Sequence, residues 1–120
     1  MRYAILIYHK EGDEAGMTPA ERDREMGAFF AFTNAVKEAK AYAGGEALHP
    51  TSTATTVRVS GSKTMTTDGP FAETKEQLAG FYLLDCKDLD EAIDWAARIP
   101  SVSRGAVEVR PVVDFSAKAQ

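Results

Sequence analysis

The run from Tyr3 to Tyr8 constrains the fold most, because it is apolar on both faces of a β-strand. Alternate side chains of a strand point to opposite sides of a sheet. One side therefore receives Tyr3, Ile5 and Ile7, and the other receives Ala4, Leu6 and Tyr8. The run 79–86 is similar, since Phe81 and Leu83 oppose Tyr82, Leu84 and Cys86. A sheet with one solvated face would alternate apolar and polar residues, so both faces of this sheet require cover.

Two amphipathic helices are predicted. At the first, Thr18 can cap the free N–H groups, Pro19 suits the first helical position and Glu21 completes a capping box. This helix should run over 19–39, with an apolar stripe of Met26, Phe29, Phe30, Thr33 and Val36. The second begins after Asp88 and ends before Pro100, with a stripe of Leu89, Ala92, Ile93, Ala96 and Ile99.

The remaining segments read as strands and turns. Gly44-Gly45 predicts a break, followed by a short strand over 46–48, and the last strand should cover 106–112. The β-branched runs 54–60 and 63–67, joined by the two-residue turn Gly61-Ser62, predict a hairpin. Pairing Ser60 with Lys63 would set Arg58 opposite Met65 and Thr55 near Asp68.

The order strand, helix, strand, hairpin, strand, helix, strand predicts a ferredoxin-like α+β sandwich with both helices on one face of an antiparallel sheet. A single domain over 1–115 and a frayed tail over 116–120 are expected. Two arrangements could cover the second face of the sheet. An identical subunit could pack there in a two-fold dimer, or the extra hairpin could fold back over the sheet of a monomer.

Composition excludes several functional classes. The net charge is −4 and the arginines are scattered, which argues against a nucleic acid or anionic membrane partner. No apolar run approaches the roughly 20 residues of a membrane span, and the first strand is too short for a signal-peptide core. The single cysteine, Cys86, excludes an internal disulfide and is expected to be an inert core residue. A cytoplasmic location is therefore expected.

A polar signature lies between the hairpin and the next strand. Gly69 supplies unusual backbone angles and Pro70 fixes its own φ, so that residues 68–70 form a compact turn. An aromatic side chain and several charges follow within six residues: Phe71, Glu73, Lys75 and Glu76. Such a loop is either a well-made turn with solvated charges or part of a functional site.

Acid/base chemistry has three candidate residues. Either His9 or His49 could act as a general base near neutral pH, as histidines commonly do. Asp68 is the expected orienting carboxylate, because the hairpin register returns it to Thr55, a few residues beyond His49. The alternative for each histidine is an ordinary place in a surface loop. No compact metal-ligand spacing, phosphate loop or dinucleotide fingerprint is present, so neither a metal nor a cofactor is expected.

Several further residues are candidates for ligand binding. Arg58 and Lys75 could hold a ligand carboxylate, or could pair with acidic neighbours such as Asp68 and Glu73. Glu46 could point into a cleft or lie at an exposed strand edge. Glu73 belongs to the same polar loop. Tyr8 and Phe71 could line an aromatic pocket, or could serve as core or dimer contacts.

Taken together, five segments of the chain resemble the DGPF branch of the YCII-related domain family: 54–58, 68–71, 73–78, 80–82 and 107–111. The resemblance implies a dimeric α+β-barrel-like fold, related to muconolactone-isomerase-like proteins, with a cleft between helices and sheet. Some relatives look like lactone dehalogenases or isomerases, and others are linked to extracytoplasmic-function sigma factors. The YCII branch places the histidine of a His–Asp pair in its first helical region. Residues 19–39 of this chain contain no histidine, so that pair does not carry over.

Two functional hypotheses follow. The favoured one is a noncatalytic homodimeric module that binds a small molecule or contacts a sigma-factor-linked regulatory partner. The alternative is a small cofactor-free enzyme that performs acid/base chemistry on a lactone or organic acid. In that enzyme, Asp68 and a histidine would exchange protons while Arg58 or Lys75 held the substrate.

Overall fold

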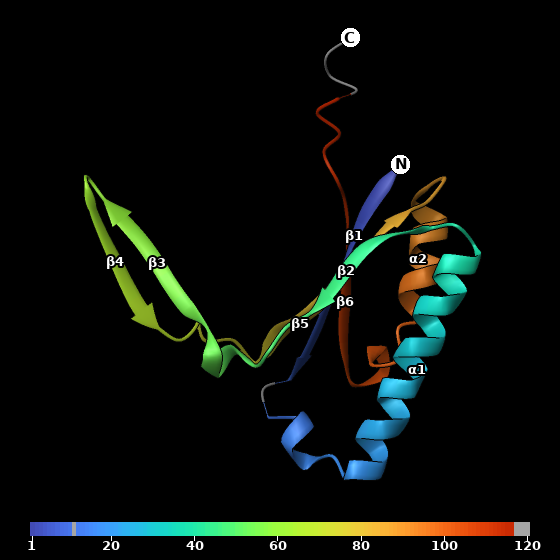
Figure 1. Ribbon diagram of the computed structural model, residues 1–120, viewed down its shortest axis with the longest axis horizontal. Coiled ribbons are helices and arrows are strands. Elements are labelled where there is room, and N and C mark those ends of the chain that lie inside the picture. The colour runs from blue at the N-terminus through green and yellow to red at the C-terminus, as the bar shows by residue number, and fades with distance from the viewer. Residues whose placement is uncertain (11, 117–120) are drawn as a thin grey trace.

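The computed structural model of this chain describes residues 1–10 and 12–116. Its main sheet is antiparallel with the strand order β2-β5-β1-β6, and the helices α1 and α2 lie on one side of it (Figure 1). The strands are β1 (Arg2–Lys10), β2 (Tyr42–Ala47), β5 (Glu76–Asp85) and β6 (Gly105–Pro111), and the helices are α1 (Pro19–Glu38) and α2 (Leu89–Ala97). A separate hairpin consists of β3 (Thr55–Ser60) and β4 (Lys63–Asp68). Three short 3₁₀ turns are η1 (Glu14–Gly16), η2 (Thr51–Thr53) and η3 (Val102–Arg104).

This architecture is α+β and is compatible with the predicted ferredoxin-like sandwich. Each half of the sheet is a strand–helix–strand unit, β1-α1-β2 and β5-α2-β6, and all neighbouring strands are antiparallel. The hairpin is inserted between the two units. Residues 117–120 of the predicted frayed tail lie outside the described residues.

Both predicted helix N-termini are confirmed. The Thr18 hydroxyl accepts a hydrogen bond from the Glu21 N–H at 3.1 Å, and the Glu21 carboxylate accepts one from the Thr18 N–H at 3.0 Å. These bonds form a capping box, and the hydrogen bond from the Thr18 backbone lowers the pKa of Glu21. At α2, the Asp88 carboxylate accepts from the Glu91 N–H at 2.9 Å.

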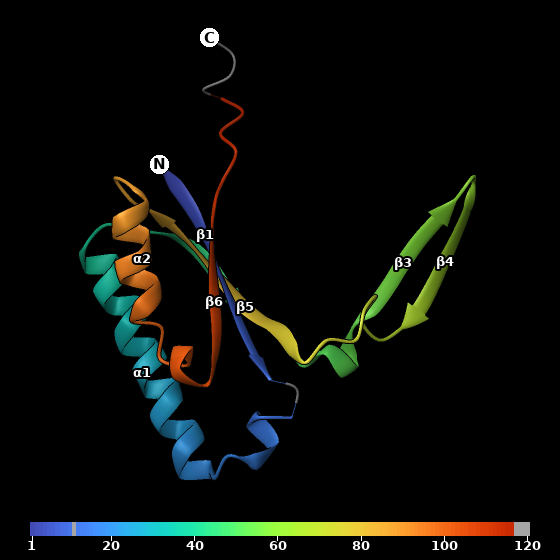
Figure 2. The same cartoon turned by 180° about the vertical axis from the view of Figure 1, so that it is seen from behind.

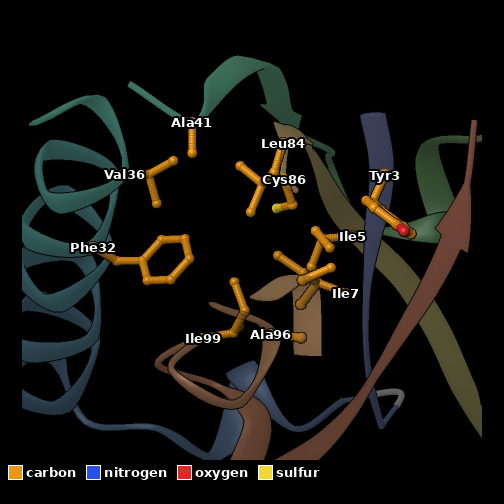
Figure 3. Close-up of a cluster of buried hydrophobic side chains, with 11 residues drawn as sticks. Tyr3, Ile5, Ile7, Phe32, Val36, Ala41, Leu84, Cys86, Ala96 and Ile99 are labelled. Carbon is orange, nitrogen blue, oxygen red and sulfur yellow. The ribbon is translucent and has the colours of Figure 1, made fainter. Parts of the chain in front are cut away.

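The core lies between the helices and the sheet (Figure 3). Ile5, Val36 and Leu84 are completely buried there. Phe32 packs edge-on against both Tyr82 and Trp95, with ring centroids 5.2 and 5.9 Å away. Cys86 is 2% exposed, which confirms its predicted place in the core, and burial raises the pKa of its thiol.

The buried helix stripes differ from the predicted ones. On α1 the buried residues are Phe32 and Val36, whereas Met26 and Phe30 are 57% and 66% exposed. The side chains of Met26 and Phe30 lie on a neighbouring face of the helix. They line a pocket and do not belong to the core. On α2, the small side chains of Ala92 and Ala96 are buried, while the predicted core residues Leu89 and Ile93 are about half exposed.

The prediction of a break at Gly44-Gly45 was wrong, because both glycines lie inside β2. A Cβ on Gly45 would come within 2.7 Å of the Phe81 carbonyl oxygen. Glycine therefore lets β2 approach β5 closely. The pairing of these two strands is irregular at this point, with a register shift between Tyr42 and Gly44. The strand predicted over 79–86 begins three residues earlier, at Glu76.

The predicted hairpin register is confirmed: Ser60 pairs with Lys63, Arg58 with Met65 and Thr55 with Asp68. The hairpin, called the arm below (55–68), stands on the side of the sheet away from the helices (Figure 2). It does not fold back over the sheet, so the monomer version of the sequence prediction was wrong. The two strands pair with each other, and the Gly69 N–H closes the base of the arm on the Ala54 carbonyl oxygen at 2.7 Å.

The face of the sheet turned away from the helices is called the open face below. Its central row contains Phe81, Leu6 and Glu108, and the next row contains Leu83, Ala4 and Arg110. Leu6, Phe81 and Leu83 are only half-buried. The predicted two-sided apolar character of the sheet is therefore confirmed, and the side chains of this chain leave the open face incompletely covered.

Candidate functional site

The candidate site is a pocket of about 460 Å³ between α1 and the sheet. Its walls come from α1 between Arg22 and Thr33, from β2 and from the middle of β5. Aromatic and thioether side chains dominate these walls: Met17, Met26, Phe29, Phe30, Tyr42 and Tyr82. The volume falls in the range of small-molecule sites, which are largely apolar with a few polar groups.

The polar end of the pocket is held together by Arg104. Its guanidinium donates from Nη2 and Nε to the two carboxylate oxygens of Glu25, at 2.6 and 2.9 Å. Its Nη1 lies 3.3 Å from an Asp13 carboxylate oxygen. These contacts join η3, α1 and the segment after β1, and the hydrogen bonds to Glu25 raise the pKa of Arg104. Arg104 is therefore a cation held in place by two carboxylates.

His9 stands at the same end of the pocket. Its Nε2 lies 3.4 Å from a Glu14 carboxylate oxygen, and its side chain is only 16% exposed. The Glu14 carbonyl oxygen in turn accepts a hydrogen bond from Arg22 at 3.0 Å, which ties η1 to α1. A histidine beside a carboxylate has the composition of an acid/base pair, although the carboxylate is Glu14 and not the predicted Asp68.

Two hydroxyl groups complete the lining. The Tyr82 hydroxyl lies 2.7 Å from the Thr33 hydroxyl across the pocket wall, and burial raises the pKa of Tyr82. Ser101 is 2% exposed, and its hydroxyl has no hydrogen-bond partner among the described residues. Buried polar groups normally find a partner. Ser101 lies beside the pocket, but its hydroxyl is itself fully buried.

A second hollow lies beside the first, at the base of the arm. It shares His9 and Glu14 with the pocket, and it also brings in His49, Pro70 and Glu73. Thus three of the residues selected from the sequence, His9, His49 and Glu73, line one depression. In the described part of the chain, neither histidine forms an ion pair or a side-chain hydrogen bond with Asp68.

The other predicted site residues are dispersed. Asp68 and Arg58 lie on the arm, and Phe71 and Lys75 are exposed in the following loop. Tyr8 lies on the side of β1 opposite the pocket, and its hydroxyl donates to Glu108 at 3.4 Å. Burial and the Glu108 carboxylate raise the pKa of Tyr8. Glu46 lines the pocket from the edge strand β2.

Sequence reasoning missed Glu14, Glu25, Ser101 and Arg104. The signal for Glu25 and Arg104 was weak, since the two are 79 positions apart and each resembles an ordinary surface charge. Phe30 and Met26 carried a usable signal. A helix with a second apolar row beside its buried row has more apolar surface than a single core contact requires.

Comparison with known proteins agrees with the family prediction. Residues 1–116 match the family model of the YCII-related domain. The chain belongs to the YCII-related domain family. An uncharacterized protein of Rhizobium meliloti (strain 1021) is 43% identical over 114 residues, which cover 93% of this chain and 92% of the relative.

Two further findings bear on the class of protein. Within residues 1–10 and 12–116, no group of three or more histidine, cysteine, aspartate or glutamate side chains could hold a metal ion. The described helices are also too short or too polar to cross a membrane.

Proposed function

We propose that this YCII-family chain is a dimeric module that binds a small molecule in the pocket between α1 and the sheet. The observation that carries the proposal is the composition of the pocket, which has aromatic walls and one polar end.

The charges of the pocket favour a neutral ligand. Arg104 is engaged by Glu25 and Asp13, and Arg22 by the Glu14 carbonyl oxygen. Glu14 and Glu25 line this end of the pocket, and the Asp13 carboxylate lies against Arg104. A ligand carboxylate would therefore meet three protein carboxylates beside two guanidinium groups that are already engaged, whereas an amide, ester or lactone could hydrogen-bond with His9.

A matched pair of probes tests this proposal. Phenylacetamide and phenylacetate have similar shapes and differ in charge, and small lactones extend the panel. We expect the neutral probes to raise the melting temperature more than phenylacetate does. A ligand present at 100 times its dissociation constant adds about 2.7 kcal/mol to the free energy of unfolding. Phe30→Ala should weaken binding, whereas Phe71→Ala, at a residue that is also exposed but lies outside the pocket, should not. No shift with any neutral probe would contradict the proposal.

The dimer is supported by the open face. Leu6, Phe81 and Leu83 are half-buried there, and fully burying one such side chain contributes about 1.5–3 kcal/mol. A two-fold dimer in which each copy covers the open face of the other would correspond to the dimeric assembly expected from the sequence. Sedimentation at micromolar concentration should show a dimer, and a stable monomer would contradict this part of the proposal.

Acid/base catalysis is the second candidate function, and the contact between His9 and Glu14 favours it. In that case His9 would be the general base at the polar end of the pocket, oriented by Glu14. His9→Gln should then lower turnover of a lactone by roughly 10²–10⁴-fold. Asp68→Asn serves as the comparison, since Asp68 is the orienting carboxylate predicted from sequence. Turnover that survives His9→Gln would exclude this assignment.

A further inference from the structure

The arm is ordered without being packed. In β3 and β4 every residue is exposed except Thr56, which is half-buried. Within the described residues the two strands form a sheet only with each other, and the Thr56 hydroxyl donates to the Gly69 carbonyl oxygen at the base of the arm at 2.8 Å. An isolated two-stranded ribbon is marginally stable in water and needs further packing to persist. The radius of gyration, 16.7 Å, exceeds the roughly 14 Å of a compact chain of this length.

One face of the arm has the composition of a packing surface. Val57 and Val59 lie on this face and are 58% and 65% exposed, and their cross-strand partners are Thr66 and Thr64. β-branched residues are favoured where a strand packs against another surface. The opposite face carries Met65, which is 44% exposed, between Arg58 and Lys63.

The arm and the open face lie on the same side of the molecule, away from α1 and α2 (Figures 1 and 2). A single partner on this side could contact both surfaces at once. Each copy of the chain has one arm and one open face, so two copies related by a two-fold axis can exchange the same contact reciprocally.

One pair of opposite charges lies on the two surfaces that would meet. The face of the arm with Val57 and Val59 also carries Asp68, the cross-strand partner of Thr55, and the open face carries Arg110 beside Glu108. Asp68 and Arg110 form no ion pair among the described residues. Arg58 and Lys63 lie on the opposite face of the arm and take no part in this contact.

We propose that the arm of each copy packs across the open sheet face of a second copy, with Val57 and Val59 as its apolar contacts. This inference rests on the proposed self-association and adds the element that holds the dimer together. The half-exposed apolar side chains of the open face and the exposed valines of the arm then cover each other. The order of the arm depends on the partner copy and not on its own chain.

The first test is sedimentation velocity of the full chain carrying Val57→Thr and Val59→Thr. Threonine keeps the shape and strand propensity of valine but replaces a methyl group with a hydroxyl. We expect the dissociation constant of the dimer to rise about tenfold or more. Val113→Thr is the control, because Val113 is also 58% exposed but lies outside the arm, and it should leave the dimer unchanged. An arm variant that dimerises like the wild type would overturn this inference alone, whereas a monomeric wild type would overturn the self-association as well.

A second test locates the arm directly. Cys86 is the single cysteine of the chain and is buried, so Ser62→Cys places one reactive thiol at the arm tip for a nitroxide label. Labelled protein is mixed with isotopically labelled protein that carries no nitroxide, and relaxation is measured on the second copy. We expect broadening of amides in the open face around Leu6 and Phe81, and little in α2. Broadening confined to the helices, or none in a sample that is dimeric, would overturn the proposal.

Discussion

The helix-covered side of the sheet and the arm contain similar kinds of residues and bury them very differently. In the covered region, Ile5, Val36 and Leu84 are completely buried. In the arm, Val57 and Val59 are more than half exposed. Both regions have regular backbone pairing, so hydrogen bonding does not distinguish them. The difference lies in side-chain burial, which supplies most of the free energy of folding.

This contrast assigns each region a different source of order. The covered region is stabilised by contacts within one chain and can hold a pocket whose walls are fixed. The valines of the arm have no such burial, and in the proposed dimer the partner copy supplies the packing that an isolated ribbon lacks. Stability measurements should therefore respond to core changes in every condition, and to arm changes only when a partner is present.

The largest effect is expected from Leu84→Ala. Leu84 is completely buried between the sheet and the helices, and removing such a side chain costs about 2–5 kcal/mol through lost burial and the cavity left behind. Urea denaturation should show this decrease in the free energy of unfolding. Leu89→Ala, on the exposed side of α2 where Leu89 is 48% exposed, should cost much less. Equal losses of unfolding free energy from Leu84→Ala and Leu89→Ala would contradict the position of Leu84 in the core.

A smaller effect is expected from Arg104→Met. The change leaves Glu25 and Asp13 without their shared cation, and a hydrogen bond to a charged group contributes about 1.5–3 kcal/mol. We expect a loss in this range, reduced by solvent screening because the Arg104 side chain is 20% exposed. Asp85→Asn is the control, since its contact with the N-terminus is well exposed and should contribute less than about 1 kcal/mol. Similar losses for both changes would show that the Arg104 cluster is an ordinary surface network.

The sequence was sufficient to predict most of the fold because the relevant signals are local. Caps such as Thr18 with Glu21, the alternation in β1 and the turn at Gly61-Ser62 all act within a few residues. The break predicted at Gly44-Gly45 failed because a close approach between strands also favours glycine, and that reason depends on β5. A local pattern cannot separate the two causes.

The site could be predicted only in part, because its contacts join distant positions. His9 and Glu46 were selected from the sequence and line the pocket. Arg104 and Glu25 were not, since their pairing depends on how η3 meets α1. The strong turn signal at Asp68 drew attention to the arm, where that residue pairs with Thr55.

Thr18→Ala should cost about 1 kcal/mol, since it removes the N-cap of α1. The Glu21 side of the capping box should depend on pH. The Thr18 backbone lowers the pKa of Glu21 in the folded state, so this contribution is present above the unfolded pKa and is lost as pH falls through the lower folded value. Thr18→Ala keeps that backbone N–H, so Glu21→Gln tests the trend in urea titrations at pH 7 and at acidic pH. The difference between wild type and Glu21→Gln should shrink on acidification, and a difference that grew would contradict the capping box.

The smallest effect is expected from Val59→Thr in dilute protein. If the arm packs only on a second copy, the 65% exposed Val59 side chain contributes little to a monomer, and the free energy of unfolding should change by less than about 0.5 kcal/mol. At concentrations where the chain is dimeric, stabilisation by the partner adds to that of the fold, and the same change should then lower the melting temperature. Leu84→Ala should instead destabilise the protein at every concentration. A large, concentration-independent loss from Val59→Thr would show that the arm is stabilised by its own chain, and the distinction between the two regions would no longer hold.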